Sequence, residues 1–272
     1  MVYIPPGKFW MGEGTAEKIH EIPYGYYIDK TPVTISQYEK FVKSPGFRPR
    51  LAQALELGKI NGDEFAQSLE KWSKGPAWWQ NKYHAPENWE LDGTHPVIGV
   101  SWFESLAYSL WAGKSLPHES EWEKAARGGE KIPQWQGERW EWKENPKRKY
   151  TWGNDWKEDK VNSASFWVPN YKDWQKEFFD KQLWKKQTLT TSVNDPRFDA
   201  AISPYGCKDM LGNVWEWCSD WYEKNMWRSC RGGSWITRRA FVRVSCRDRH
   251  APVNRGDLGF RVVCRSLSDS GL

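Results

Sequence analysis

Regular periodicity is confined to a few short stretches of this 272-residue chain, separated by long runs rich in Gly, Pro, Asn and Asp. Apolar spacing predicts a helix over 34–43 with Thr34 as its N-cap, and another over 101–114 that Gly113 closes. A third helix is predicted over 122–127, with a cap at Ser120 and paired glycines after it. Short strands are predicted at 9–12, 24–30 and 259–265. With no internal repeat, the chain is predicted to form one domain long enough to bury a core.

Tryptophan is the most unusual component, with 21 residues, many of them in short mixed blocks such as WQGERWEWKEN. Clustered rings can form a stacking platform for single-stranded nucleic acid or sugar. These rings are spread along the chain, which favours a second interpretation: they fill gaps between loops and bond their indole N–H groups to backbone carbonyls. The net charge of +5 is too small and too dispersed to indicate nucleic-acid or membrane binding.

The cysteines and the chain start exclude several other classes. The five cysteines form no CxxC pair and have no histidine at ligand spacing, so we expect buried thiols rather than disulfides or zinc. No apolar run approaches a membrane span, and Met1 leads into VYIPPGKFWMG without a charged-then-apolar leader. We therefore expect no signal peptide and no membrane insertion. A place on a virion or cell surface, reached by assembly, stays open.

Several longer motifs carry a resemblance. In order along the chain stand VYIPPGKFWMGE, HPVIGVSWFESLAYSLWAGKSLPHESEWEKAARGG, SPYGCKDMLGNVWEWCSDWY, RGGSW and GDLGFRVV. This series resembles the formylglycine-generating-enzyme (sulfatase-modifying factor) family over nearly the whole chain. The resemblance implies an α+β, C-type-lectin-like fold, loop-rich with short helices and small twisted sheets. It implies a single domain over 1–272, with polar insertions near 46–95 and 129–195.

The same resemblance bears on catalysis. The family's oxidases place two cysteines shortly after the GGS motif, where they bind copper and convert a substrate cysteine to formylglycine. The matching positions here are Thr237 and Val242, and neither can replace the thiolates that Cu(I) prefers. Cys246 lies further along and is alone. We therefore expect no catalytic residues and no required cofactor, the alternative being a formylglycine-generating-type oxidoreductase or accessory enzyme.

The segment after Trp235 has a restricted composition. It contains no Lys, Glu, Gln, Met or Trp, although these five types form about a third of residues 1–235. The segment resembles the end of variable proteins of diversity-generating retroelements, which use the same fold and the frame RGGSW…R…R…P…R…GFR. Those genes randomise adenines in codons whose third base stays a pyrimidine, and such codons cannot encode the five missing types. The matching frame residues are Arg243, Arg247, Pro252, Arg255, Gly259, Phe260 and Arg261.

This second resemblance implies a non-catalytic ligand-binding protein whose diversified site lies within 236–258. An ordinary non-catalytic family member, which would also favour Arg, Asp, Asn and Pro here, is the alternative. Exposed side chains can vary freely when a rigid frame holds the backbone. The predicted ligand-facing residues are Thr237, Arg238, Arg239, Phe241, Cys246, Asp248, Arg249, His250, Asn254 and Asp257. Because arginine, aromatic rings and histidine dominate, the expected partner is an acidic protein or glycan.

The remaining residues of the segment are expected to face inward. The apolar ones are Ala240, Val242 and Val244. The frame residues Arg243, Arg247 and Arg261 are expected to point away from the ligand into buried hydrogen bonds. GFRVV is expected to pair with RGGSW at the end of the domain.

A structural calcium ion is one further expectation from the family resemblance. Family members hold Ca²⁺ near GNVWEW with Asn, Glu and backbone oxygens, and the matching donors here are Asn162, Asn213 and Glu216. Alternatively, Asn213 fixes a turn through its side chain and Glu216 pairs with a frame arginine.

Overall fold

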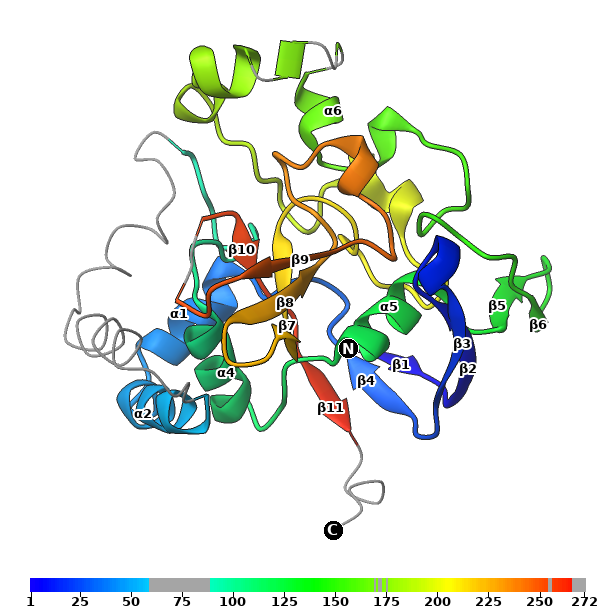
Figure 1. Ribbon diagram of the computed structural model, residues 1–272, viewed down its shortest axis with the longest axis horizontal. Coiled ribbons are helices and arrows are strands. Elements are labelled where there is room, and N and C mark those ends of the chain that lie inside the picture. Colours follow the sequence, from blue (N-terminus) through cyan, green and yellow to red (C-terminus); the bar gives the residue numbers. More distant parts are fainter. Residues whose placement is uncertain (59–88, 169, 171–172, 175, 254–255, 266–272) are drawn as a thin grey trace.

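The computed structural model describes residues 1–58, 89–168, 170, 173–174, 176–253 and 256–265 (Figure 1). Its helices are short, and none within these ranges is long and apolar enough to cross a membrane. They are α1 (Ile35–Val42), α2 (Phe47–Leu57), α4 (Trp102–Trp111), α5 (Glu119–Arg127) and α6 (Ala164–Trp167). Figure 1 shows α1, α2 and α4 together on one side of the molecule, and α5 on the other side of the central strands.

The strands form two small sheets and two hairpins. A three-stranded sheet has the order β1-β4-β11, and a four-stranded sheet has the order β10-β7-β8-β9. The first sheet contains β1 (Val2–Ile4), β4 (Tyr26–Ile28) and β11 (Val263–Arg265). The second contains β7 (Trp215–Glu223), β8 (Trp227–Arg231), β9 (Arg247–His250) and β10 (Leu258–Gly259). The hairpins pair β2 (Gly7–Met11) with β3 (Lys18–Ile22), and β5 (Lys131–Trp135) with β6 (Trp140–Glu144).

The first two predicted helices are confirmed, including their caps. Thr34 Oγ1 accepts from the Gln37 N–H of α1, and the Gln37 side chain accepts from the Thr34 N–H at 2.9 Å. Ser101 and Glu104 form the same reciprocal pair at the start of α4. Such capping boxes satisfy N–H groups that have no partner inside the helix.

The predicted start of the third helix is wrong. We expected a cap at Ser120, whereas α5 already includes Glu119 and Ser120. The His118 N–H donates to the Glu121 carboxylate at 2.7 Å, and the Glu119 N–H donates to Asp220 Oδ2 at 2.8 Å. Asp220 belongs to β7, so half of this cap comes from a residue distant in sequence.

The predicted strands are present, but one predicted pairing is wrong. Residues 9–12, 24–30 and 259–265 overlap β2, β4 and the pair β10 and β11. We expected GFRVV to pair with RGGSW. Instead β10 lies parallel to β7, with Leu258 opposite Trp215, and β11 pairs with β4. Gly232 and Gly233 have positive φ values of 97° and 81°, so the chain turns away from the sheet just after β8.

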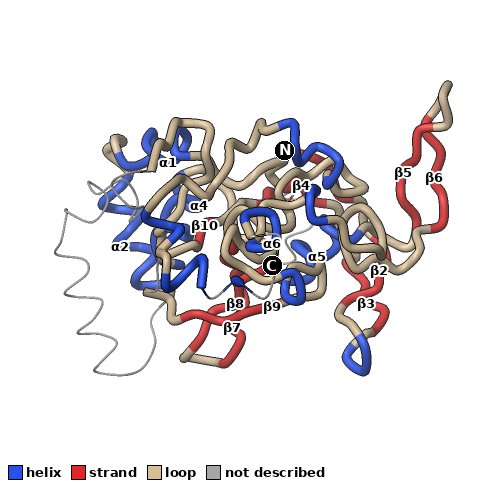
Figure 2. Tube along the Cα trace, turned by 90° about the horizontal axis from the view of Figure 1, so that it is seen from above, coloured by secondary structure: helices blue, strands red, loops and turns tan. Residues whose placement is uncertain are grey.

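The insertions predicted near 46–95 and 129–195 contain elements that the sequence pattern did not reveal. The first begins with α2, which packs on α4, and its residues 59–88 lie outside the described ranges. The second begins with the β5–β6 hairpin, which projects from the body of the molecule (Figure 2).

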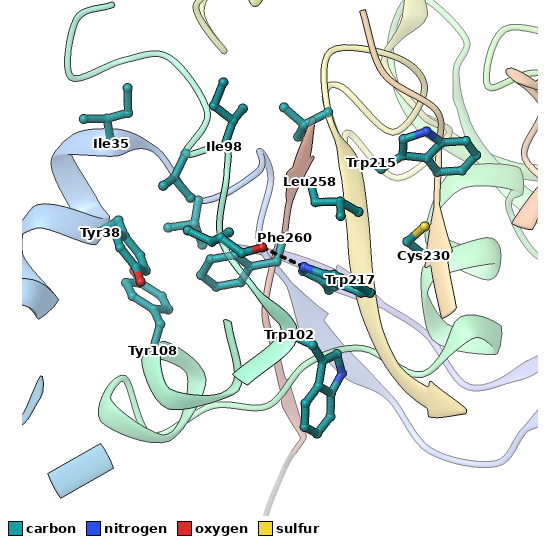
Figure 3. Close-up of a cluster of buried hydrophobic side chains, with 14 of the residues drawn as sticks. Ile35, Tyr38, Ile98, Trp102, Tyr108, Trp215, Trp217, Cys230, Leu258 and Phe260 are labelled. Carbon is teal, nitrogen blue, oxygen red and sulfur yellow. Dashed lines mark hydrogen bonds between the residues drawn. The ribbon is translucent and has the colours of Figure 1, made fainter. Parts of the chain in front are cut away.

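Buried tryptophans build much of the core, as the gap-filling interpretation predicts. Trp217 is fully buried and its Nε1–H donates to the Val100 carbonyl at 2.9 Å (Figure 3). Trp102 bonds the Cys218 carbonyl in the same way at 2.8 Å. Around them pack Tyr38 and Phe260 from opposite ends of the chain, with ring centroids 6.3 Å apart. Each indole thereby fills space and satisfies a loop carbonyl.

One buried ion pair joins the C-terminal segment to this core. Arg261 and Glu216 have side chains 0% and 1% exposed, and two hydrogen bonds of 2.6 and 2.7 Å connect them. Trp122 Nε1 donates to the same carboxylate at 2.7 Å. Arg261 also donates to the carbonyls of Asp29 and Lys208. The pair therefore connects four parts of the chain: Glu216 belongs to β7 and binds α5, and Arg261 binds two loops.

Arg261→Met should lower the free energy of unfolding by about 3–5 kcal/mol, because it leaves the Glu216 carboxylate buried without its cation. Lys43→Met is the matched control, since it removes the exposed i,i+4 pair with Glu39 and should cost at most about 0.5 kcal/mol. Urea denaturation of both variants measures the difference. Equal losses would contradict the role assigned to Arg261.

Candidate functional site

Seven of the ten predicted ligand-facing residues line one open pocket of about 450 Å³. It lies between the 3₁₀ turn Arg239–Phe241 and strand β9. The seven are Thr237, Arg238, Phe241, Cys246, Asp248, His250 and Asp257. Arg239 and Arg249 are exposed but do not line the pocket, and Asn254 lies outside the described residues.

Exposure in this segment separates the predicted site from the frame, with one exception. The nine predicted residues that the structure describes are exposed or half-buried, and the Phe241 side chain is 46% exposed. Val242 and Val244 are fully buried, as expected. Ala240 was expected to face inward and is exposed, because it lies in the surface 3₁₀ turn.

The predicted orientation of the frame arginines is correct for Arg261 but wrong for Arg247. The Arg247 side chain is 43% exposed, lines the pocket and binds Glu119 at 2.9 and 2.5 Å. It begins β9, the edge strand, whose first three residues are all exposed. Arg243 is intermediate: it is half-buried and binds Glu13 at 2.6 Å.

Three other lining residues were not predicted. Trp174 comes from the second insertion, Trp215 begins β7, and Ile236 follows Trp235. Trp215 is buried while still bordering the pocket. Trp174 lies some sixty residues before the segment, and no local pattern connects it to the site.

Arginine–aromatic contacts shape the pocket wall. The Arg238 guanidinium lies over the rings of Trp174 and Phe241, at 5.3 and 5.4 Å from their centroids. Outside the pocket, Tyr222 of β7 contacts Arg247 at 4.3 Å and Arg249 at 5.2 Å. Such cation–π contacts hold long side chains in place, which lowers the entropy lost when a ligand binds.

Polar groups of the pocket lining, Thr237 and Asp257, bind Ser234 behind them. Ser234 Oγ donates to Asp257 Oδ2, and burial raises the pKa of that carboxyl group. The Ser234 N–H donates to Thr237 Oγ1 at 2.9 Å. His250 also lines the pocket, and its ring lies edge-on to the Trp217 ring. The pocket can therefore donate and accept hydrogen bonds beside apolar rings, a combination typical of ligand sites.

The two positions that match the copper cysteines of the related oxidases are neighbours in space. A Cβ atom built on Gly233 would lie 3.3 Å from Thr237 Cγ2 and 3.2 Å from Val242 Cγ2. A hydroxyl and an isopropyl group do not supply the thiolates that Cu(I) needs. Cys246 is half-buried, and burial raises the pKa of its thiol. These residues do not fit a copper centre, and the described residues contain no cluster of three His, Cys, Asp or Glu that could hold a metal.

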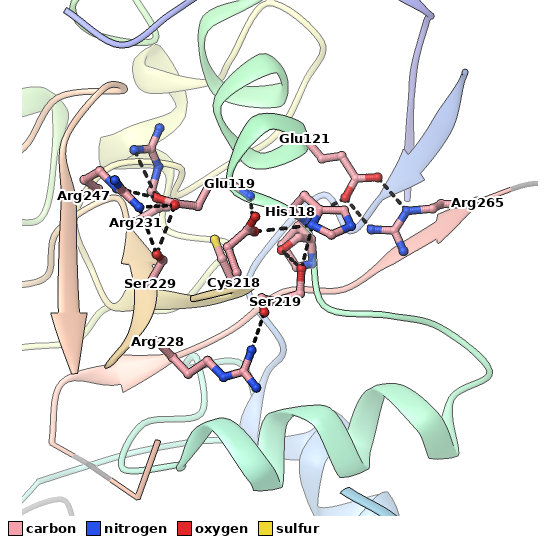
Figure 4. Close-up of polar contacts among 12 residues, drawn as sticks. His118, Glu119, Glu121, Cys218, Ser219, Arg228, Ser229, Arg231, Arg247 and Arg265 are labelled. Atoms are coloured by element: carbon pink, nitrogen blue, oxygen red, sulfur yellow. Dashed lines mark hydrogen bonds and ion pairs between the residues drawn. The ribbon is translucent and has the colours of Figure 1, made fainter. Parts of the chain in front are cut away.

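A serine, a histidine and an aspartate also meet beyond the pocket (Figure 4). Ser219 Oγ lies 3.0 Å from His118 Nδ1, and Asp220 Oδ2 lies 3.4 Å from the same nitrogen. The hydrogen bond to Asp220 raises the pKa of His118. A nucleophile–base relay needs the serine and the aspartate on opposite ring nitrogens, so this arrangement is not a catalytic triad.

The three candidate calcium ligands are engaged with nitrogen donors. Asn162 Oδ1 accepts from Trp167 Nε1 at 2.7 Å, and Asn213 Oδ1 accepts from the Thr191 N–H at 3.1 Å. Both Glu216 oxygens accept from Arg261. Asn213 has a positive φ of 63°, as a turn-forming residue often does. These contacts are those of the alternative, a turn at Asn213 and an ion pair at Glu216, and the calcium ion stays a prediction.

The fold and the RGGSW and GFR motifs indicate a protein of the sulfatase-modifying-factor type, and comparison with known proteins agrees. The family described as "Sulfatase-modifying factor enzyme 1-like domain" matches residues 1–266, so the chain belongs to that family. It is 30% identical to the formylglycine-generating enzyme of Streptomyces coelicolor, over 96% of this chain and 87% of the relative. It is also 30% identical to the inactive C-alpha-formylglycine-generating enzyme 2 of Mus musculus, over 96% and 84%.

Solved structures confirm the α+β fold of this type. Treponema denticola variable protein 1 superposes with a TM-score of 0.58 at 19% identity, covering 98% of this chain and 95% of that one. PvdO from Pseudomonas aeruginosa gives a TM-score of 0.57 at 20% identity, covering 97% and 93%. At this identity the likeness concerns the fold alone.

Frame and site residues should differ in their effect on stability. Trp235 is 9% exposed and packs against Trp89 and Phe178, so Trp235→Ala should cost about 3–5 kcal/mol. Phe241→Ala, a matched aromatic truncation at the pocket, should cost no more than about 0.5 kcal/mol. Thermal unfolding of the two variants tests the division, and comparable losses would show that Phe241 belongs to the frame.

Proposed function

We propose that this protein is a non-catalytic binding protein that presents a diversified C-terminal site on a formylglycine-generating-enzyme-type scaffold. The observation that carries the proposal is the sorting of residues 237–257. Side chains from a 3₁₀ turn, an edge strand and a loop line one pocket, while Val242 and Val244 between them and Arg261 just after them are buried. Free substitution is tolerated only at exposed positions, so this sorting is what repeated randomisation of the segment requires.

The frame explains how such variation leaves the fold intact. Backbone contacts fix both ends of the segment: the Trp235 N–H donates to the Asn213 carbonyl, and β10 pairs with β7, with Leu258 opposite Trp215. The fold likeness to Treponema denticola variable protein 1 supports the same interpretation without establishing it. The partner we propose is a protein or glycan, and the exposed arginines favour an acidic one.

The second candidate is an oxidoreductase of the formylglycine-generating type, favoured by the names of several relatives. Thr237 and Val242 argue against it, since the chemistry of those enzymes depends on a thiol-bound metal. A relative named as inactive at 30% identity is consistent with loss of catalysis on this fold.

The purified protein should bind no Cu(I) at its C-terminal site and should leave the cysteine of a CxPxR peptide unmodified. The reason is that the two matching side chains cannot ligate a soft cation. The Streptomyces coelicolor relative, assayed in parallel, is the positive control. Stoichiometric Cu(I) binding that disappears in Cys246→Ser would overturn the proposal.

A library randomised at Arg238, Arg239, Phe241, Asp248 and Arg249 should contain mostly folded members, with unfolding free energies within about 1 kcal/mol of the parent. A matched library at five buried positions, Val242, Val244, Trp217, Leu258 and Phe260, should be mostly unfolded. Surface display followed by limited proteolysis measures both. Equal loss from the two libraries would refute a site built for variation.

A further inference from the structure

The projecting β5–β6 hairpin carries exposed tryptophans that the C-terminal pocket does not use (Figure 2). Trp140 and Trp142 are 66% and 56% exposed. They are two apart on β6, so they share one face of the ribbon and stand about 7 Å apart along the strand. Ile132, on the opposite face, is buried against Gly128 and holds the base of the hairpin to the domain.

The tryptophan face leads directly into a pocket of about 510 Å³. Trp142 and its neighbours on that face, Lys131 and Glu144, line the pocket together with Trp10 and Tyr205 of the body. The backbone there is well fixed, because the Glu130 N–H donates to Lys8 O and the Asn145 N–H donates to Glu130 O. The pocket therefore contains the Trp142 ring, and Trp140 stands on the same face two residues nearer the hairpin tip.

A buried ammonium group forms part of the pocket wall. Lys124 is 1% exposed, and its Nζ donates to the carbonyls of Pro5 and Gly7 at 2.7 and 2.8 Å. Burial lowers the pKa of Lys124 to about 8. These two carbonyls are its acceptors within the described ranges, which leaves one of three N–H donors for another acceptor.

The charges of the hairpin cancel one another. Residues 131–144 hold three cations and three carboxylates, a net charge of zero. Each cation has a carboxylate neighbour: Lys131 with Glu144 at 3.5 Å, and both Arg139 and Lys143 with Glu141 at 2.7 and 2.6 Å. Nucleic acids need uncompensated cations to bind phosphates. Exposed rings beside paired charges suit a neutral ligand that is rich in hydroxyl groups.

We propose that Trp140, Trp142 and the adjoining pocket form a second binding site, for a neutral oligosaccharide. Sugar rings would stack their C–H faces on the indoles, while Glu144, Asn145 and Lys124 meet hydroxyl groups within the pocket. The two pockets share no lining residue, so this site is independent of the diversified one.

Titration of the whole protein with cellohexaose, maltohexaose and chitohexaose tests the proposal, followed by calorimetry and by NMR of the indole N–H resonances. We expect at least one hexasaccharide to bind with a Kd near or below about 1 mM and to shift the Trp140 and Trp142 resonances. Trp142→Ala should weaken binding by about tenfold or more. Trp142→Phe, which keeps a ring, should retain most of the affinity.

Phe241→Ala is the matched control, since it removes an exposed ring from the other pocket and should leave the affinity unchanged. Thermal unfolding checks that each variant is folded. The proposal is overturned if none of the three sugars binds, if Trp140→Ala/Trp142→Ala binds like the parent, or if Phe241→Ala weakens binding equally. Tighter binding of a short oligothymidylate, lost in Trp142→Ala, would overturn it in favour of nucleic acid.

Discussion

The buried pair between Arg261 and Glu216 is the contact on which the rest of this fold depends. Much of the chain within the described residues is loop, so few backbone ladders hold the pieces together, and a guanidinium can satisfy several loop carbonyls at once. Arg261 does this for Asp29 and Lys208, while Arg261 and Trp122 both donate to the Glu216 carboxylate. Removing charges from water is costly, and the cost is offset here because every charged oxygen of Glu216 has a donor.

Helix α5 repeats the same device with three buried carboxylates. Glu119 binds Arg247 and Glu121 binds Arg265 (Figure 4), and Glu123 binds Arg231. These three arginines all come from the last fifth of the chain. The helix thereby holds β8, β9 and β11 in fixed positions. Among its described residues, the stretch between Trp235 and Leu258 contributes only Val242 and Val244 to the buried hydrophobic core. Side chains elsewhere in it can therefore change without loss of the fold, which is the physical condition for a diversified site.

The sequence predicted features that depend on neighbouring residues and missed those that depend on distant ones. Both capping boxes lie within four residues, so the starts of α1 and α4 were correct. The start of α5 was missed because Asp220 supplies half of its cap from a hundred residues away. The predicted site residues did not include Trp174, because it too is distant in sequence. Arg247 was predicted to belong to the frame, but its position on an edge strand exposes its side chain. Seven of the ten site residues were nevertheless brought together, since the frame motif fixes where the segment turns.

The distribution of tryptophans separates scaffold from surface in the same way. An indole whose N–H reaches a loop carbonyl, as in Trp217 and Trp102, replaces the backbone ladder that a loop lacks, and its removal would leave both a cavity and an unsatisfied carbonyl. Trp140 and Trp142 are largely exposed, so burial in this chain does not account for their presence on a hairpin whose charges already balance. A solvent-exposed ring contributes little to the free energy of folding. It contributes to the free energy of binding when a partner covers it. The same residue type thus stabilises the scaffold at one set of positions and is available for recognition at another.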